Sequence, residues 1–414
     1  MRVGIVGLGY VGLPLAVAFA AAGVEVLGVD SDLARVEGVA AGRSFIEDVS
    51  DGDLAAALPR LRASADYAEL AQVDAVVICV PTPLSPNREP DLRALLDCTR
   101  SLAQVLVAGQ LVVLESTSYP GTTRERVAPL LEAGSGLRAG ADFNLAYSPE
   151  RVDPGRTDYT LANTPKVVGG LTEPCGDRAE ELYRRICDEV VRVSSPESAE
   201  LTKLLENIFR AVNIALVNEL ALLTDRMGID IWEVIDAAAT KPYGFMRFTP
   251  GPGMGGHCLP VDPFYLAWRA REFDMPVEFI ELAGKLNQQM PYHCVAKLQR
   301  TLNEQGLAVK GARIAVLGVS YKPGVGDVRE SPALKIIELL RELGADVVYH
   351  DAHVPQFEAA GLRSLELSDA LEGVACAVIV TAQPGIDYDE LAAGVPSVLD
   401  LRGVTRPAPN VVRL

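Results

Sequence analysis

Residues 2–30 have the sequence RVGIVGLGYVGLPLAVAFAAAGVEVLGVD, which runs from an apolar segment through a glycine-rich turn to a carboxylate. This order predicts a buried strand over residues 2–6, an alanine-rich helix after Gly12, and a second strand that ends at Asp30. The stretch leads into a glycine motif and not into a cleavage site, so we do not interpret it as a secretory signal. It predicts the βαβ start of a Rossmann-type parallel sheet. A glycine turn in another kind of α/β protein remains the alternative.

The glycine motif G-x-G-x-x-G begins at Gly7 and predicts a dinucleotide site. Gly7 allows a tight turn, Gly9 lets the backbone approach a pyrophosphate at the helix N-terminus, and Gly12 lets helix and strand pack closely. Asp30 is placed to accept hydrogen bonds from the adenosine ribose, and a carboxylate there repels a 2′-phosphate. The cofactor expected is therefore NAD. We also assign Tyr10, Val11 and Arg35 to this site.

Three further strand-like runs cover residues 73–83, 110–121 and 144–155. Ligands of an open parallel sheet bind at the carboxyl ends of its strands. We therefore expect Pro81, Thr82, Thr117 and Glu150 to lie near the cofactor and the group that it oxidises. Turn or helix-cap chemistry remains an alternative for each threonine.

Residues 196 to about 226 carry a helical period without internal glycine or proline, after a capping-type Ser195. Such a helix is about 45 Å long, enough to leave one domain and reach another and to provide a dimer surface. Lys203 and Asn207 share one face of it, either as part of a solvated stripe or as groups directed at a site.

After residue 310 the order of strand, loop, helix and strand is repeated, without the glycine motif. Lys322 and Arg329 stand in the loop, before a helix N-terminus that favours anions, which suggests a different phosphate ligand. A structural repeat with surface charges is the alternative. The predicted fold is α/β, with two Rossmann-like, doubly wound parallel sheets joined by the long helix and a helical dimerisation region. Its expected domains are residues 1–195, 196–300 and 301–414.

The composition narrows the classes of partner. A net charge of −17 disfavours nonspecific binding to nucleic acid or to an anionic membrane. We expect no membrane span, because no further stretch is uninterruptedly apolar over the required length. The seven cysteines form no C-x-x-C pair, which is typical of reduced thiols and predicts a cytoplasmic protein. The histidines do not cluster, and we interpret HDAH at 350–353 as a loop after a strand, with no metal site.

Residues 251–263, GPGMGGHCLPVDP, form a glycine- and proline-rich segment around Cys258. A cysteine in such a loop, within a chain that binds NAD, suggests covalent catalysis on a carbonyl. A thiolate that captures an aldehyde would allow a second oxidation, to a thioester that water then hydrolyses. The alternative is that Cys258 only fills the loop core.

The chain resembles the UDP-glucose/GDP-mannose dehydrogenase family over essentially its full length. The matching blocks, in order, are GLGYVGLPLA, VPTPL, ESTSYPGTT, YSPERVDPG, AELTKLLEN, GPGMGGHCLPVDP, SYKPGVGDVRESPAL and DLRG. Several such blocks in one order are far more specific than a lone glycine motif.

The resemblance implies oxidation of a nucleotide-sugar C6 alcohol to a carboxylate, with two NAD reduced, usually in a homodimer. It implies that Cys258 is the nucleophile and that Lys203 and Asn207 stabilise the oxyanion. Asp262 and Thr117 would position water and assist proton transfer, and Glu150 would act as general base in thioester hydrolysis. The substrate-binding residues that we assign are Glu150, Arg151, Val152, Lys203, Asn207, Arg247, Gly255, Lys322, Arg329 and Arg402.

The substrate is predicted from departures within these blocks. Val261 stands where UDP-glucose enzymes of the family have lysine, and Arg151 and Val152 replace Phe-Leu. With these departures the sequence resembles the branch of the family that oxidises UDP-N-acetylhexosamines. UDP-N-acetylglucosamine is the substrate that we expect first. UDP-N-acetylmannosamine, UDP-glucose and a catalytically silent nucleotide-sugar binder remain alternatives. Arg247 is either a substrate contact, from this subunit or a partner, or a surface charge.

Overall fold

The computed structural model describes residues 1–85, 87–152, 158–256 and 259–414. The chain forms two compact units. The first unit comprises Met1–Glu206 with Phe264–Met275, and the second comprises Asn207–Pro263 with Pro276–Leu414. The domain limits expected from the sequence remain a prediction.

The first unit is built on an eight-stranded sheet with the order β3-β2-β1-β4-β5-β6-β7-β8. Neighbouring strands are parallel except β6 and β7, which pair antiparallel. In register, Arg2 of β1 lies opposite Glu25 of β2, and Val3 opposite Ala75 of β4. The strands are β1 (Arg2–Val6), β2 (Glu25–Val29), β3 (Leu61–Ser64), β4 (Ala75–Ile78), β5 (Leu111–Leu114), β6 (Asn144–Tyr147), β7 (Lys166–Gly170) and β8 (Val190–Val193).

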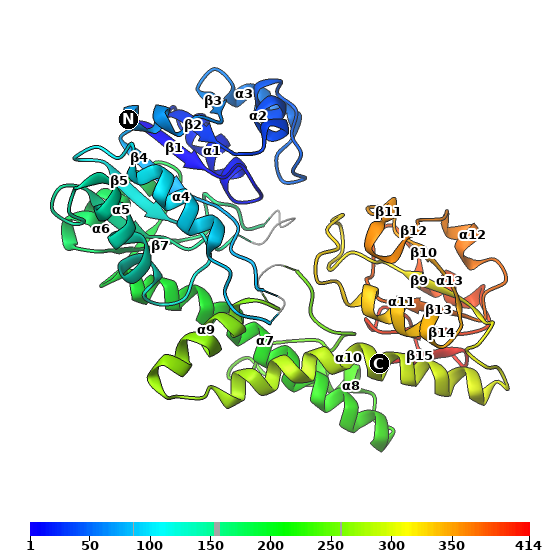
Figure 1. Cartoon of the computed structure of the whole chain (residues 1–414). Coiled ribbons are helices and arrows are strands. Elements are labelled where there is room, and N and C mark those ends of the chain that lie inside the picture. Colours follow the sequence, from blue (N-terminus) through cyan, green and yellow to red (C-terminus); the bar gives the residue numbers. More distant parts are fainter. Residues whose placement is uncertain (86, 153–157, 257–258) are drawn as a thin grey trace. The chain divides into compact units, whose positions relative to one another are not determined.

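Helices cover both faces of this sheet (Figure 1). Val3 and Ile5 of β1 pack with α1, α3 and α6 in one core, whereas Val76 and Ile78 of β4 pack with α4 and α5 in the other. Strands buried on both faces explain the continuous apolar runs of the sequence. The helical segments before α7 are α1 (Gly12–Ala21), α2 (Leu33–Ala40), α3 (Asp51–Ala57), η1 (Tyr67–Gln72), α4 (Arg93–Ala103), η2 (Thr123–Val127), α5 (Ala128–Ser135) and α6 (Glu173–Tyr183).

The second unit contains a five-stranded, all-parallel sheet with the order β10-β9-β13-β14-β15. Apolar residues of α10 and α11 cover one face and those of α13 the other, so this sheet is also doubly wound. Its strands are β9 (Arg313–Leu317), β10 (Asp346–His350), β13 (Cys376–Ile379), β14 (Val398–Asp400) and β15 (Val411–Arg413), and β11 (Gln356–Phe357) and β12 (Leu362–Arg363) form a small hairpin. The helical segments after α7 are α8 (Ile231–Ala239), α9 (Asp262–Ala270), η3 (Arg271–Phe273), α10 (Glu278–Glu304), α11 (Pro332–Glu342), η4 (Glu358–Ala360), α12 (Leu367–Leu371) and α13 (Tyr388–Ala393).

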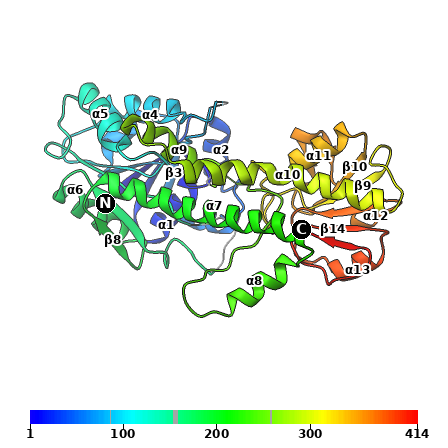
Figure 2. The ribbon, with the colours of Figure 1, turned by 90° about the horizontal axis from the view of Figure 1, so that it is seen from below.

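The long helix α7 (Pro196–Met227) is the continuous element expected from the sequence (Figure 2). The Ser195 hydroxyl accepts a hydrogen bond from the Ser198 N–H at 3.2 Å and so caps the helix. By length and composition alone, α7 is the one helix in the described residues that is long and apolar enough to cross a membrane. A single helix of this kind is weak support for a span, because core helices pass the same test.

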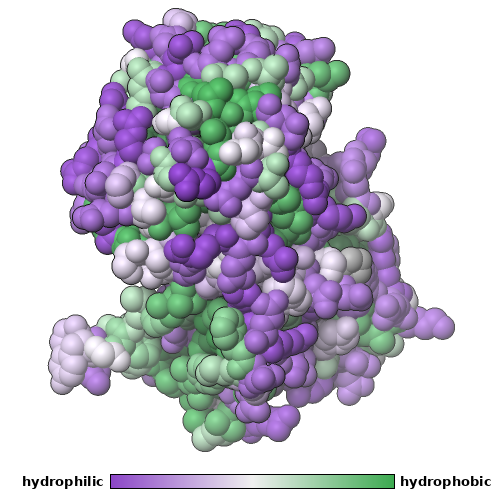
Figure 3. Space-filling view, turned by 60° about the vertical axis from the view of Figure 1, so that its left-hand side comes forward, coloured by the Kyte–Doolittle hydropathy of each residue, from purple (hydrophilic) through white to green (hydrophobic). Residues whose placement is uncertain are grey.

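Apolar side chains are exposed along one stripe of α7. At 3.6 residues per turn their positions fall on one face of the helix. Figure 3 shows hydrophobic surface gathered in the lower part of its view. The exposed stripe consists of Leu201, Leu205, Phe209, Leu216, Leu220, Leu223 and Met227.

Candidate active site

The glycine motif forms a tight turn between β1 and α1. Gly7 has a φ of 93°, in the left-handed region that favours glycine. A Cβ on Gly12 would lie 1.8 Å from the Gly7 carbonyl oxygen, so only glycine allows the helix to start this close to the strand. The geometry expected for these two glycines is therefore present.

Asp30 lies at the end of β2 and is buried, with 7% exposure. Its Oδ2 accepts a hydrogen bond from the Leu8 N–H at 2.7 Å, and its Oδ1 accepts one from the Asp32 N–H at 2.9 Å. Arg35 approaches Oδ2 at 3.4 Å. The carboxylate thus holds the glycine loop in place, in addition to its expected role toward a ribose.

This loop has the features that NAD needs. No side chain caps the N-terminus of α1, and the positive end of the helix dipole there favours a pyrophosphate. The Leu13 N–H is bonded to the Gly9 carbonyl oxygen, at 3.0 Å. The space around a Cβ on Gly9 is open, because the nearest atom would be Arg35 Nη1 at 4.0 Å. The residues that would hold NAD here are Gly7, Gly9, Tyr10, Val11, Gly12, Asp30 and Arg35.

The structure brings together two threonines that the sequence placed at strand ends. The Thr82 hydroxyl donates a hydrogen bond to the Thr117 carbonyl oxygen at 2.8 Å. The Tyr265 hydroxyl in turn donates to the Thr82 carbonyl oxygen at 2.9 Å. Pro81, the residue before Thr82, is exposed. Thr82 and Thr117 therefore share the carboxyl edge of the sheet, after β4 and β5.

Glu150 follows β6 at the same edge and lies beside α7. Lys203 of α7, with 8% exposure, donates from Nζ to the Glu150 carbonyl oxygen at 2.5 Å. Glu150 Oε1 accepts hydrogen bonds from the N–H groups of Arg151 and Val152, at 2.9 and 2.6 Å. Arg151 itself forms an ion pair with Glu206 at 2.7 Å. The main chain therefore fixes one oxygen of Glu150.

Buried charges behind Glu150 were not predicted from the sequence. Lys166 Nζ lies 3.2 Å from Glu150 Oε2 and 3.0 Å from Glu115 Oε1. The Tyr183 hydroxyl donates to Glu115 Oε1 at 2.5 Å. The sequence did contain a signal for these charges, because a single charged residue borders each of two apolar strands. Glu115 directly follows β5, and Lys166 is the first residue of β7.

These charges shift each other's ionisation. Burial opposes the charged form of Glu150, but Lys166 and the Val152 N–H outweigh it, so the pKa of Glu150 lies below its usual value. Burial also opposes the charge of Lys166, yet Glu115 and Glu150 raise the pKa of Lys166 above its usual value. Burial raises the pKa of Glu115 despite the nearby lysine.

Asn207 and Asp262 meet within the second unit. Asn207 Nδ2 donates to Asp262 Oδ2 at 2.6 Å, and Asp262 is 1% exposed at the start of α9. Asn207 follows Lys203 by one turn of α7. Cys258, the proposed nucleophile, lies outside the described residues together with its neighbour His257.

The glycine-rich segment before Cys258 contacts the loop that replaces the glycine motif in the second unit. The Gly256 N–H donates to the Arg329 carbonyl oxygen at 3.0 Å. A Cβ on Gly255 would lie 2.7 Å from Cβ of Tyr321, so the close approach requires glycine. Arg329 Nε donates to both oxygens of Asp327, and the Lys322 ammonium lies 5.6 Å from the Tyr321 ring centroid. The structure thus groups Gly255 with Arg329 and with the loop of Lys322.

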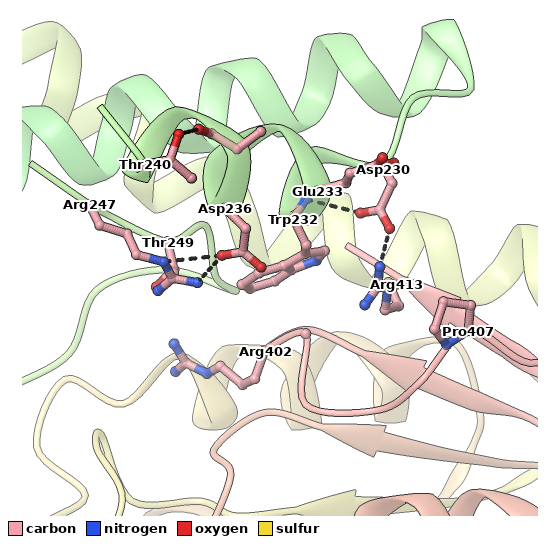
Figure 4. Close-up of a pocket in the computed structure, with 12 residues that line it drawn as sticks. Asp230, Trp232, Glu233, Asp236, Thr240, Arg247, Thr249, Arg402, Pro407 and Arg413 are labelled. Carbon is pink, nitrogen blue, oxygen red and sulfur yellow. Dashed lines mark hydrogen bonds and ion pairs between the residues drawn. The ribbon is translucent and has the colours of Figure 1, made fainter. Parts of the chain in front are cut away.

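Arg247 and Arg402 line one open pocket of about 880 Å³ within the second unit (Figure 4). Arg247 is paired with Asp236 at 2.7 Å. Arg402 donates from Nε to the Val380 carbonyl oxygen at 2.6 Å, and burial lowers the pKa of Arg402 to about 10. The remaining lining residues are Asp230, Trp232, Glu233, Ala237, Thr240, Thr249, Gly403, Pro407 and Arg413, with Asp236 among them.

Family models match the chain in three consecutive segments. Residues 1–187 match the NAD binding domain of the UDP-glucose/GDP-mannose dehydrogenase family, residues 197–289 its central domain and residues 315–407 its UDP binding domain. The chain belongs to the UDP-glucose/GDP-mannose dehydrogenase family. The family expected from the sequence blocks is thereby confirmed, as are the fold class and NAD as cofactor.

Individual relatives are similar over most of the chain. UDP-N-acetyl-D-mannosamine dehydrogenase from Pyrococcus horikoshii is 37% identical, covering 99% of this chain and 97% of that protein. UDP-N-acetyl-D-glucosamine 6-dehydrogenase from Pseudomonas aeruginosa is also 37% identical, covering 87% of this chain and 84% of that protein. A solved structure of the Pyrococcus horikoshii UDP-D-ManNAc dehydrogenase covers 100% of this chain and 98% of its own, with a TM-score of 0.91 and 35% identity.

The chain is thus an NAD-dependent nucleotide-sugar dehydrogenase, an oxidoreductase with a UDP-sugar as substrate. The Rossmann-type fingerprint carries the cofactor side of this function. The cation-bearing loop after β9 lies in the segment that matches the UDP binding domain.

Proposed function

We propose that the enzyme oxidises the C6 primary alcohol of a UDP-N-acetylhexosamine to the carboxylate. One alcohol, two NAD⁺ and one water yield one carboxylate, two NADH and three protons. NAD, when bound, accepts the hydride in each oxidation. The proposal is supported by the pairing of the expected groups along α7: Lys203 with the Glu150 main chain, and Asn207 with Asp262.

The proposed covalent step uses Cys258. Its thiolate adds to the C6 aldehyde after the first oxidation and forms a thiohemiacetal, whose oxidation gives a thioester. Lys203 and Asn207, both hydrogen-bond donors, stabilise the oxyanion of these adducts. Thr117 and Asp262 position water and move its proton, and Glu150 acts as general base when water cleaves the thioester and frees the thiol.

Two epimers are the leading substrates. The relatives named for UDP-N-acetylmannosamine and UDP-N-acetylglucosamine are equally similar in identity, and the first covers more of the chain. UDP-N-acetylglucosamine remains our first expectation from Arg151, Val152 and Val261, and the full-length match favours UDP-N-acetylmannosamine as the second.

The decisive experiment measures NADH formed per sugar consumed, with the purified enzyme and each of UDP-N-acetylglucosamine, UDP-N-acetylmannosamine, UDP-N-acetylgalactosamine and UDP-glucose. We expect two NADH per sugar on an acetamido substrate. Cys258→Ser is expected to abolish carboxylate formation while NAD binding persists, and Cys98→Ser, a buried thiol on α4, is the matched control. Normal turnover by Cys258→Ser would contradict the covalent mechanism, and one NADH per sugar would indicate a simple dehydrogenase.

We also propose a cytoplasmic homodimer that associates through the exposed stripe of α7. The stripe supports this, because a second copy would remove its leucines from water. The buried, unpaired thiols among the described cysteines support a reducing compartment. Sedimentation analysis should show a dimer that Leu216→Glu with Leu220→Glu dissociates. The control Leu343→Glu, which changes an exposed leucine at the end of α11, should leave the dimer intact.

A further inference from the structure

The side chain of Glu150 is held from behind by a buried cluster of charges in the first unit. Lys166 is 2% exposed and contacts both Glu150 Oε2 and Glu115 Oε1, at 3.2 and 3.0 Å. Its ammonium also lies 5.1 Å from the Tyr183 ring centroid. An ammonium in this position has two carboxylates to satisfy it and little access to water.

The buried charges of this cluster destabilise the folded state when any one of them lacks its partner. A lysine or a glutamate that is buried without a partner strongly destabilises the folded state, because its charge loses its hydration and gains nothing in return. Glu115 Oε2 is buried and has no hydrogen-bond partner in the described part of the chain. Replacing buried ion pairs by packed apolar residues is often neutral or stabilising, so stability alone does not account for this cluster.

We propose that Lys166 is a positioning residue that orients the Glu150 carboxylate and keeps it ionised, and that Glu115 and Tyr183 hold Lys166 in place. The inference rests on the proposed function, in which Glu150 is the general base. Main-chain N–H groups fix one oxygen of Glu150 and Lys166 fixes the other. A base held at both oxygens keeps one orientation toward the water that it activates.

Several groups from neighbouring elements act on Glu150. Burial raises the pKa of Glu150, whereas Lys166 from β7 and Lys203 from α7 lower it, and the net shift is downward. Glu115 after β5 acts through Lys166, which it contacts directly. Arg151 is paired with Glu206. The thiols of Cys79 and Cys187 also interact with the cluster, and burial raises the pKa of each.

The sign of the expected effect follows from this arrangement. The base form of Glu150 is present above its pKa and is lost as the pH falls through it. Removing the positive charge of Lys166 raises that pKa, so activity is lost at a higher pH than in the parent enzyme. An opposite charge at this distance shifts a carboxylate by about 1–3 pH units.

The main test uses Lys166→Met together with Glu115→Gln, because the second change avoids a buried, unpaired carboxylate. Infrared difference spectra between each protein and its Glu150→Gln version report the ionisation of Glu150 without substrate. We expect the Glu150 titration and the acidic limb of kcat to move upward together by about 1–3 pH units, with KM unchanged. Lys166→Arg keeps the positive charge, so the Glu150 titration in this variant should lie within half of that shift from the parent enzyme.

The matched control is Lys297→Met, which removes another buried lysine, 2.6 Å from Asp225 in the second unit. It should leave the Glu150 titration unchanged. An unchanged Glu150 titration in the folded double variant would overturn the inference. Should that variant fail to fold, as judged by circular dichroism, Lys166→Gln takes its place, and an unchanged titration there would overturn the inference in the same way.

The infrared titration separates this inference from the proposed function. If no UDP-sugar is oxidised but the Glu150 titration moves as expected, the electrostatic role of Lys166 stands and the proposed function fails. If UDP-sugars are oxidised with two NADH each and the titration does not move, only the role of Lys166 fails.

Discussion

The two sheets of the molecule use the same device at the start of their first βαβ turn. In the first unit, Asp30 after β2 accepts a hydrogen bond from the Leu8 N–H, in the loop after β1. In the second unit, Asp351 after β10 accepts hydrogen bonds from the N–H groups of Val319 and Ser320, after β9, at 2.7 and 3.1 Å. A buried carboxylate thus fixes the loop in both units.

The loops themselves differ. In the first unit α1 begins at Gly12, shortly after Gly7, whereas in the second α11 begins only at Pro332, although the corresponding glycine is Gly318. The first loop is short and glycine-rich. The second is longer and carries Lys322 and Arg329. Both units therefore share the same geometry at the ends of their strands, and they differ in the loop between strand and helix, which is where ligands of such folds bind.

The largest effect is expected from removing the two loop-holding carboxylates, Asp351 and Asp30, which should differ in their consequences for stability and for NAD affinity. Asp351 is 1% exposed, and its two oxygens also accept hydrogen bonds from Gln383 Nε2 at 3.0 and 2.9 Å. Asp351→Ala leaves several buried donors unsatisfied, so we expect a loss of about 4 kcal/mol in the free energy of unfolding, with NAD affinity unchanged. Asp30→Ala should destabilise less and weaken NAD binding. Denaturant titration and calorimetry measure both; equal losses of NAD affinity would contradict the comparison.

The next effect concerns the tight loop of the first unit. Gly12→Ala places a methyl group 1.8 Å from the Gly7 carbonyl oxygen, so strand and helix must separate. We expect a loss of about 3 kcal/mol in stability and at least about a tenfold loss of NAD affinity. Gly52→Ala on α3, where the nearest atom is 3.6 Å from the new Cβ, is the control and should bind NAD normally. Normal NAD affinity in Gly12→Ala would refute the role given to the fingerprint.

A smaller effect is expected in the pH dependence of stability, which should differ between the two units. Burial raises the pKa of Glu200 from its ordinary 4.5 to about 7, although Thr123 and Gly121 donate hydrogen bonds to it. The folded state therefore holds this proton more tightly, and the first unit should lose about 2 kcal/mol as the pH rises from about 5 to about 7. Glu200→Gln should remove that slope.

The stability of the second unit should depend on pH in the opposite direction, and fall as the pH is lowered. Burial opposes the charge of Asp225, but Lys297 and Arg300 outweigh it and lower the pKa of Asp225. Its contribution is present above the ordinary pKa of an aspartate and is lost only as the pH falls through the lowered value. Hydrogen exchange read separately in each sheet checks this. A first unit that gains stability between pH 5 and 7 would contradict the prediction.

The smallest effect tests the longer loop of the second unit. Lys322→Met removes a cation from the segment that matches the UDP binding domain. We expect the KM for the UDP-sugar to rise about tenfold, with the KM for NAD unchanged, because one charge-assisted contact to phosphate is lost. Lys335→Met on α11, where the lysine is paired with Glu338, is the control. A change in the KM for NAD would show that the two loops are not specialised.

Much of this fold follows from local patterns. The first strand, the glycine turn and the long helix from Pro196 were predicted close to their observed limits, because each depends on neighbouring residues in the chain. The repeat after residue 310 was also predicted, since its strand, loop and helix have the same order. The meeting of Thr82 and Thr117 followed from the rule that parallel strands end at one edge.

The family, the dinucleotide fingerprint and the shared face of Lys203 and Asn207 on α7 were readable from the amino-acid sequence, because they depend on short spacings along the chain. Two contacts emerge only in the folded chain: Lys166 lies between Glu115 and Glu150, and Asp351 holds the loop after β9. The cause is that a charge at the end of an apolar strand acquires its partners only when strands distant in sequence become neighbours in the sheet. Burial then strengthens the interaction of Lys166 with its two carboxylates, because the protein interior screens charges less than water does.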